Sequence, residues 1–386
     1  MRSAVALFAA FTLLLAGCAS VEDTTPDPTP LADFEAEANL EKRWSVSTGG
    51  AFNRRWIQLQ PAIRDDVLYT VNVSGEVKAH NRDTGKRLWR SPMGQFVSSG
   101  VGVDDEHVYI GTQDGMLIAL DRTDGERVWD RSMRGELLAP PAADEGVVIV
   151  RTVDGRVTAL APEDGERAWS FSSSVPELSL RGASQPVIIE GGVLVGLDNG
   201  RVRAVESRSG ESFWETQVAE PEGRTPIDRM VDIDGRLGVG REMIYAAAYQ
   251  GRVVQIEPRQ GLVGWSREIS SYVGLSLDER RVFVTDERGT VRALDKRDGS
   301  EQWQQEQLAW RGVSAPIPVP DTDWLVVSDR ENHVHLLHRE DGRIIARGRM
   351  EGRWGILSDP LVDDDGRIYI QGQGATVTAF DPVPRD

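Results

Sequence analysis

Apolar side chains stand at every second position in short stretches that recur along the chain. In the stretch Gly115-Met-Leu-Ile-Ala-Leu-Asp121, residues two apart are apolar, and a pleated strand turns such residues to one face. Asp124-Gly125 follows and provides the left-handed backbone that a tight hairpin requires. The next stretch contains Trp129. The pattern therefore predicts two antiparallel strands joined by a tight turn.

This unit occurs seven times, and its closing residue always stands fourteen positions after the opening one. An eighth opening half, Ala375 to Asp381, ends without its Trp, and Trp44 near the N-terminus supplies the missing partner. The seven units are Gly75 to Trp89, Gly115 to Trp129, Gly155 to Trp169, Gly200 to Trp214, Gly251 to Trp265, Gly289 to Trp303 and a degenerate Asn332 to Ala346.

A second pair of short strands precedes each unit, as in Val103 to Gly111 and Val362 to Ile370. Each repeat therefore makes four antiparallel strands, and successive repeats open 38 to 51 residues apart, in or near the range of propeller blades. One such sheet cannot bury its own faces, whereas radial stacking buries both. We expect an all-β, eight-bladed β-propeller of four-stranded antiparallel blades. The N-terminal strand with Trp44 should join the C-terminal blade and close the ring.

The N-terminus carries a separate signal. Arg2 precedes a short apolar run, Ala4 to Gly17, which suits a secretory peptide and is too short to span a bilayer. The run ends in Leu15-Ala16-Gly17-Cys18, a bacterial lipobox, and Cys18 is the only cysteine. An unmodified, buried cysteine is the alternative interpretation. We expect residues 1–17 to be a lipoprotein signal peptide, residues 18–40 to be lipidated Cys18 and a Pro-rich tether, and residues 41–386 to form the propeller.

Charge and anchor together narrow the partners and the location. The net charge of −17 disfavours nucleic acid and anionic lipid headgroups as partners, because both would be repelled. The acylated Cys18 would then be the membrane attachment. Ala19, where Asp would signal retention, favours the outer membrane of a Gram-negative bacterium, on its periplasmic face.

Candidate chemical sites are sparse. His333, His335 and His338 invite a metal interpretation, but the repeat places the first two at variable, non-core strand positions, and no further ligand stands at a fixed spacing. The acidic turn Asp363 to Gly366 matches a hairpin and lacks the later Glu of a calcium loop. No phosphate-binding loop or nucleophile elbow is present. We expect no catalytic residues, no metal and no cofactor.

Two consecutive connections between blades are longer than most others. Their additional residues fall in Ser172 to Gln185 and Val218 to Arg236, which should emerge side by side on one face of the disc and form a binding surface. In the first, Leu178 and Leu180 either point outward together beside Arg181 or tuck into the blade. In the second, Asp228, Asp232 and Asp234 form either an acidic rim or a solvated turn.

The repeat Gly-x-Val-x-Ala-Leu-Asp-x-x-Asp-Gly-x-x-x-Trp resembles the quinoprotein, or PQQ-like, propeller repeat. Together with the lipobox, Leu178 to Gly182 and Ile227 to Asp234, the chain resembles the BamB family of lipoproteins of the β-barrel assembly machinery (BAM). The resemblance implies a non-catalytic scaffold that binds the periplasmic POTRA domains of BamA, and through BamA the rest of the complex, and that also guides unfolded barrel proteins. It also implies that the contact residues are Leu178, Leu180, Arg181, Asp232 and Asp234.

Two other classes remain open from the sequence. A periplasmic PQQ-dependent dehydrogenase uses related repeats, but such enzymes are usually longer and many carry adjacent cysteines, whereas this chain has one cysteine. An envelope glycan-binding propeller could stack sugars on Trp310 or Trp354, although packing is the alternative role of both. The degenerate seventh repeat, with Asn332 and Ala346, puts the regularity of that blade in question.

Overall fold

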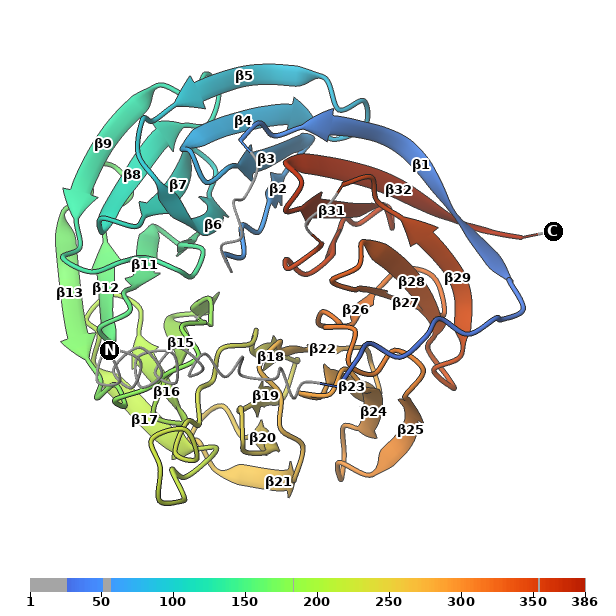
Figure 1. The fold of residues 1–386 in the computed structure, drawn as a ribbon. Coiled ribbons are helices and arrows are strands. Elements are labelled where there is room, and N and C mark those ends of the chain that lie inside the picture. The colour runs from blue at the N-terminus through green and yellow to red at the C-terminus, as the bar shows by residue number, and fades with distance from the viewer. Residues whose placement is uncertain (1–25, 51–56, 183, 353–354, 386) are drawn as a thin grey trace, which may run out of the picture.

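The chain forms a ring of eight four-stranded antiparallel sheets around a central axis (Figure 1). This computed structural model describes residues 26–50, 57–182, 184–352 and 355–385. Those residues contain strands and turns and no α-helix. Accordingly, the described ranges include no helix of the length and hydropathy needed to cross a membrane. The predicted eight-bladed β-propeller is confirmed.

Each blade runs from an innermost strand near the axis to an outermost strand on the wall. Blades 1 to 4 consist of β2 (Ala62–Arg64), β3 (Val67–Val71), β4 (Glu76–Asn81) and β5 (Arg87–Pro92); β6 (Val97–Val103), β7 (His107–Thr112), β8 (Met116–Asp121) and β9 (Arg127–Ser132); β10 (Ala142–Asp144), β11 (Val147–Arg151), β12 (Arg156–Leu160) and β13 (Arg167–Ser172); and β14 (Val187–Ile189), β15 (Gly192–Gly196), β16 (Arg201–Glu206) and β17 (Ser212–Gln217).

Blades 5 to 8 continue around the ring. They consist of β18 (Gly238–Val239), β19 (Ile244–Ala247), β20 (Val253–Ile256) and β21 (Val263–Arg267); β22 (Leu275–Leu277), β23 (Arg281–Thr285), β24 (Val291–Asp295) and β25 (Glu301–Gln305); β26 (Ile317–Pro318), β27 (Trp324–Ser328), β28 (His333–His338) and β29 (Ile344–Arg349); and β30 (Leu361–Val362), β31 (Ile368–Gly372), β32 (Thr376–Pro384) and the N-terminal β1 (Ala38–Ser47).

The fourteen-residue interval has a structural cause at the junctions between blades. The Trp129 ring on β9 packs against Gly165 in the next blade's hairpin, and its Nε1 donates a hydrogen bond to the Pro162 carbonyl at 2.7 Å. Trp303 meets Gly342 and the Arg339 carbonyl, at 2.9 Å, in the same way. Gly342 has a φ of +73°, and a Cβ there would lie 2.4 Å from the Trp303 ring. These two Asp-Gly turns therefore close their own hairpins and also receive the preceding blade's tryptophan.

The degenerate seventh repeat follows from the way in which the ring closes. Blade 8 takes its outermost strand from the N-terminus, so no hairpin turn follows β32 that could receive a tryptophan from β29. Ala346 stands there instead, 2% exposed, in a cluster with Ala38 and Leu40 of β1. Blade 7 keeps its four strands, so the small residue reflects a different junction and not an irregular blade.

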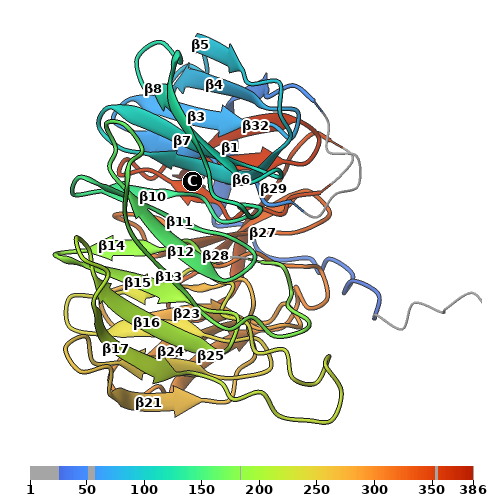
Figure 2. The same cartoon turned by 90° about the vertical axis from the view of Figure 1, so that its left-hand side faces the viewer.

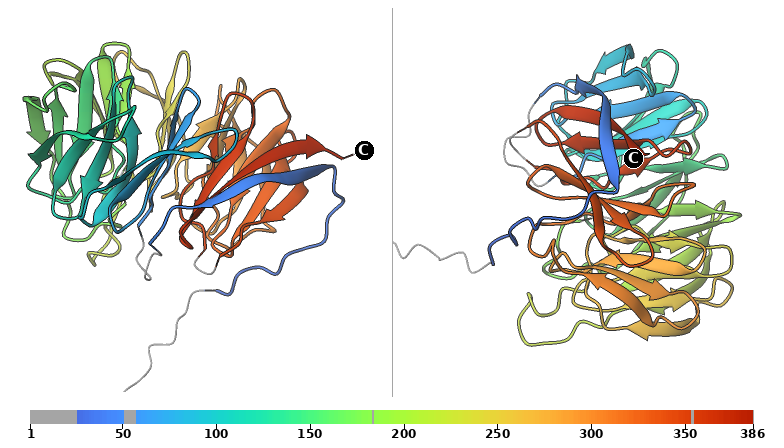
Figure 3. Two further views of the ribbon diagram at one scale, coloured as in Figure 1. Left: turned by 90° about the horizontal axis from the view of Figure 1, so that it is seen from above. Right: turned by 90° about the vertical axis from the view of Figure 1, so that its right-hand side faces the viewer.

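The two termini meet in blade 8, as predicted. β1 pairs antiparallel with β32, with Trp44 opposite Ala379, and the Ser45 and Thr378 hydroxyls lie 3.0 Å apart. The pairing is visible where the blue and red ends of the chain run together (Figures 1 and 3). Trp44 then packs against Gly85 of blade 1. The N-terminal strand therefore seals blade 8 and also contacts blade 1.

The segment before β1 lies against the propeller instead of forming a free tether as far as residue 40. The Thr29 amide donates to the Ala309 carbonyl at 3.1 Å, the Arg347 guanidinium lies 4.9 Å from the Phe34 ring centre, and Glu37 pairs with Arg343 at 2.8 Å. Leu31 and Phe34 cover an apolar cluster of blades 6 and 7. The predicted signal peptide, residues 1–17, and Cys18 lie outside the described residues.

Candidate functional site

The two long connections lie side by side on one face of the disc, as predicted. They join β13 to β14 and β17 to β18, and the second extends from the same face as the N-terminal segment (Figures 2 and 3). The Ser184 hydroxyl in the first donates to the Gly235 carbonyl in the second at 3.0 Å. A Cβ on Gly182 would lie 2.5 Å from the Asp234 carboxyl. The first loop therefore rests directly on the second.

Two leucines are exposed on the first loop. Leu178 is 44% exposed and Leu180 is 36% exposed, so the interpretation in which both tuck into the blade is wrong. A cavity of about 310 Å³ lies at this loop, and its lining includes Leu178, Val175 and Val153. An exposed aliphatic pair beside a hollow offers both an anchor and a place to receive one.

Arg181 links this loop to the preceding blade connection. Its backbone has a φ of +55°, a conformation that side-chain-bearing residues adopt rarely. Its guanidinium pairs with Glu136, and the Arg181 side chain is 65% exposed. The pair fixes the direction of the loop while leaving most of the guanidinium at the surface.

The acidic residues of the second loop divide into two environments. Asp228 is at the surface, where its carboxylate accepts a hydrogen bond from the Thr225 amide at 3.1 Å. Asp232 is 0% exposed, and the carboxylate oxygens of Asp234 are buried as well. Asp232 cannot touch a partner in this conformation. The two inner carboxylates therefore lie beneath the surface, and Asp234 lies directly under Gly182 of the first loop.

Two residues that the sequence analysis did not identify complete this buried group. Arg151, at the end of β11, pairs with Asp198 in the β15–β16 turn, and both are buried. Ligand atoms of Asp198, Asp232 and Asp234 all lie within 4.8 Å of one another. Asp198 occupies a repeat position that carries Val153 in blade 3, so its identity there is no signal of a special role.

Burial is the largest cause of the raised pKa values of Asp232 and Asp234. Desolvation, followed by the negative charge of Asp198, raises the pKa of Asp232 to about 6. Desolvation, followed by the charge of Asp232, raises the pKa of Asp234 to about 8, and Arg151 moderates both shifts. The backbone amides of Leu180 and Gly182 also lower these pKa values, but neither approaches in full hydrogen-bonding geometry.

The histidines of β28 occupy a different environment from the one expected. His335 is 0% exposed, so the prediction that it stands at a non-core position is wrong. Neighbouring blades cover both faces of an inner strand, and alternate positions are therefore all buried. His335 and His333 contact Asp329 at 3.3 and 3.2 Å, and the Arg311 guanidinium reaches the same carboxylate at 2.8 Å.

The acidic turn at Asp363 is the β30–β31 hairpin, as predicted, and Asp363 accepts a hydrogen bond from the Tyr369 hydroxyl at 2.9 Å.

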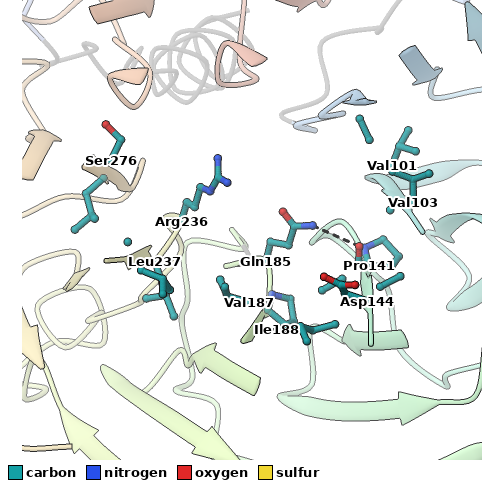
Figure 4. A pocket seen from close by; sticks show the side chains of 18 of the residues that line it. Val101, Val103, Pro141, Asp144, Gln185, Val187, Ile188, Arg236, Leu237 and Ser276 are labelled. Atoms are coloured by element: carbon teal, nitrogen blue, oxygen red, sulfur yellow. Dashed lines mark hydrogen bonds between the residues drawn. The ribbon is translucent and has the colours of Figure 1, made fainter. Parts of the chain in front are cut away.

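A cavity of about 480 Å³ lies at the axis, among the innermost strands (Figure 4). Its lining is mostly aliphatic and backbone, and the charged residues in it are Asp144 and Arg236. The Gln185 side-chain amide donates to the Pro141 carbonyl at 3.4 Å, the contact drawn as a dashed line in Figure 4. This lining provides no cluster of metal ligands, and the acidic group lies at the loops instead.

Known proteins resemble this chain over nearly its whole length. It is 44% identical to the outer membrane protein assembly factor BamB of Pseudomonas aeruginosa, over 96% of this chain and 97% of that one. It is 33% identical to the BamB of Escherichia coli, over 94% and 95% of the two chains. Among solved structures, BamB from Moraxella catarrhalis matches with a TM-score of 0.81 at 28% identity, over 89% of this chain and 99% of that chain.

More distant structures share the fold alone. Quinohemoprotein alcohol dehydrogenase from Comamonas testosteroni matches with a TM-score of 0.71 at 15% identity, over 88% of this chain and 76% of the enzyme.

The family profile described as outer membrane protein assembly factor BamB matches residues 73–305 and 287–383. The chain therefore belongs to the BamB family of outer membrane protein assembly factors.

Proposed function

We propose that this chain is a lipid-anchored scaffold of the BAM complex that docks on the periplasmic POTRA domains of BamA through the loop carrying Leu178, Leu180 and Arg181. The observation that carries the proposal is the exposed leucine pair on a loop that is braced from two sides. A preformed apolar anchor loses little conformational entropy on binding, which favours recognition of a folded partner. Holding the POTRA domains in a productive arrangement, and guiding unfolded barrel proteins along them, are the roles that we assign to this contact.

The chain is not an enzyme. Its full-length relatives are named as assembly factors, whereas the quinoprotein dehydrogenases match it only in fold, at 15% identity or less. The glycan-binding alternative depends on exposed tryptophans. Trp310 lies in the connection between blades 6 and 7 and is 37% exposed, and its backbone amide donates a hydrogen bond to the Arg288 carbonyl. Trp354 lies outside the described residues.

The docking face is tested by capture of this protein on immobilised POTRA domains of BamA. Leu178→Ala and Leu180→Ala should each weaken binding by about 1–2 kcal/mol, roughly 5- to 30-fold, because each removes part of the apolar anchor. Leu88→Ala is the matched control, since Leu88 is an exposed leucine, 53% accessible, on the outer strand β5. Equal capture of all three variants and the wild type would exclude this face.

The anchor is tested separately from the docking face. We propose that residues 1–17 are cleaved, and that acylated Cys18 holds the protein on the periplasmic face of the outer membrane. The described N-terminal segment supports this arrangement, because Thr29 contacts the blade 6–7 connection on the same face as the docking loops. Labelling with palmitate should mark the wild type and not Cys18→Ser. Membrane fractionation should place the wild type in the outer membrane and the unlabelled variant outside it.

A further inference from the structure

The carboxylates of Asp198, Asp232 and Asp234 lie close together between the first loop (β13–β14), the second loop (β17–β18) and the β15–β16 turn. Their oxygens lie within 4.8 Å of one another, and one guanidinium, that of Arg151, is paired with them through Asp198. Three carboxylates and one guanidinium leave a buried charge of −2 when all are ionised. Repulsion between such close carboxylates is strong where water is excluded.

Asp232 lacks the partners that a buried carboxylate normally has. It is 0% exposed, and neither of its oxygens accepts a hydrogen bond from the described residues. Both oxygens of Asp234 are in the same condition, and so is Nη1 of Arg151. Buried polar groups are otherwise almost always satisfied, so each such orphan needs an explanation.

Asp329 belongs to the other compact group of possible metal ligands, with His333 and His335, and it has the hydrogen-bond partners that Asp232 lacks. It is also 0% exposed, but it accepts hydrogen bonds from Arg311 at 2.8 Å and from the amides of Glu331 and His333, both at 2.9 Å. Although burial opposes the shift, hydrogen bonds from His335, the His333 amide and Arg311 lower the pKa of Asp329. Protein groups satisfy the Asp329 carboxylate, whereas no described residue gives either oxygen of Asp232 a full hydrogen bond.

We propose that Asp198, Asp232 and Asp234 bind one divalent cation, and that Ca²⁺ is the ion that suits them. Its two charges balance the remaining −2 of the group. The ligands are carboxylate oxygens without nitrogen or sulfur, which selects hard cations over zinc or copper. Ca²⁺ tolerates irregular oxygen cages, whereas Mg²⁺ demands near-ideal octahedral geometry and keeps most of its water.

The ion would join the two loops. Asp232 and Asp234 belong to the second loop, Asp234 lies directly under Gly182 of the first, and Asp198 belongs to the blade between them. A bound cation would hold Leu178 and Leu180 in place from below. This consequence depends on the proposed docking function, but the binding of the ion does not.

The test is calcium titration of the whole soluble protein in 150 mM KCl, after treatment with EDTA and its removal, by calorimetry and by thermal unfolding. We expect one saturable site and a rise of several degrees in Tm with CaCl₂, both lost in Asp232→Asn and Asp198→Asn. Asp228→Asn is the matched control: it makes the same change in the same loop at the surface, and should keep the site. It also controls for diffuse binding of Ca²⁺ to a chain of net charge −17.

The outcomes are distinct for the two proposals. Wild-type protein that shows no saturable calorimetric signal and no Tm shift with up to about 10 mM Ca²⁺ overturns the cation site, since even weak extracellular calcium modules bind at about 0.1 to 1 mM. Binding that is equal in wild type and Asp232→Asn overturns it as well. Because the measurement uses no partner, neither outcome bears on capture by the POTRA domains. A folded Asp232→Asn is verified by its cooperative unfolding in EDTA.

Discussion

Two buried aspartates on the same face of this propeller are held in opposite ways. Asp329 is surrounded by donors and has a lowered pKa, while Asp234 is surrounded by other carboxylates and has a pKa raised to about 8. Burial opposes ionisation at both sites, so the difference comes from the partners that each side chain finds. Because of this raised pKa, the stability of the protein should depend on pH through Asp234 whenever no cation is bound.

This source of pH dependence has a defined sign. An unfolded Asp titrates near 3.9, so between about pH 4 and 8 the folded state keeps a proton at Asp234 that the unfolded state releases. The stability that this proton gives the folded state is fully present below pH 4 and is lost as the pH rises toward 8. In EDTA, Asp234→Asn should therefore gain about 1–3 kcal/mol over wild type at pH 8 and little at pH 5. Thermal unfolding of both at several pH values measures this, and parallel Tm profiles would contradict it.

At the scale of elements, one glycine serves two purposes in each of blades 1 to 7. Gly342 closes the β28–β29 hairpin with a φ of +73° and also forms the surface on which Trp303 of the preceding blade packs. The hairpin requirement alone explains an Asp-Gly turn. The fixed distance to the tryptophan requires the second purpose, because hairpin and tryptophan must match between neighbours at every junction except that of blades 7 and 8.

Two glycine variants separate these purposes. Gly342→Ala strains the left-handed backbone and also drives a Cβ into the Trp303 ring, whereas Gly146→Ala, at a φ of +75°, meets nothing within 4 Å. We expect Gly146→Ala to cost about 1–2 kcal/mol, the left-handed penalty alone. Gly342→Ala should cost about 3–5 kcal/mol, because overpacking adds to that penalty. Urea unfolding of both compares them, and equal losses would show that the added Cβ does not disturb the packing of Trp303.

The elements also show what the sequence could and could not predict. The period-two stretches and the Asp-Gly turns correctly predicted blades and hairpins, because both depend on residues near one another in the chain. Closure between the two chain ends was predicted because the split eighth repeat lacks one strand that the Trp44 segment supplies. Asp232 and Asp234 were identified as an acidic cluster, but their burial with Arg151 and Asp198 was not predicted. These partners come from a strand end of blade 3 and a turn of blade 4, and they occupy repeat positions of no fixed identity. His335 was misplaced for a related reason: strand periodicity assumes one solvent-facing side, which an inner strand of a propeller lacks.

At the scale of the whole molecule, the ring depends on one joint that no covalent turn supports. Seven blades consist of four consecutive strands, while blade 8 holds β1 and β32 together by pairing between the chain ends. The tryptophan contact is missing only at the blade 7–8 junction of the described ring, where Ala346 meets β1 instead. Opening of the propeller should therefore begin with release of the N-terminal strand.

A disulfide across this joint tests where unfolding begins. Ser45 and Thr378 are paired across β1 and β32 with their hydroxyl oxygens 3.0 Å apart, so Ser45→Cys with Thr378→Cys needs only a small approach to reach a disulfide bond. In protein lacking residues 1–18, the oxidised pair should stabilise the fold by up to about 5 kcal/mol, because the bond closes a very long loop in the unfolded chain. It should also slow unfolding, because the first strand to leave is held in place. Thr378→Cys alone, and the double variant reduced with dithiothreitol, are the controls. If oxidised and reduced forms unfold at the same rate and temperature while mass spectrometry confirms the bond, the ring opens at another junction and the terminal strand is not its weak point.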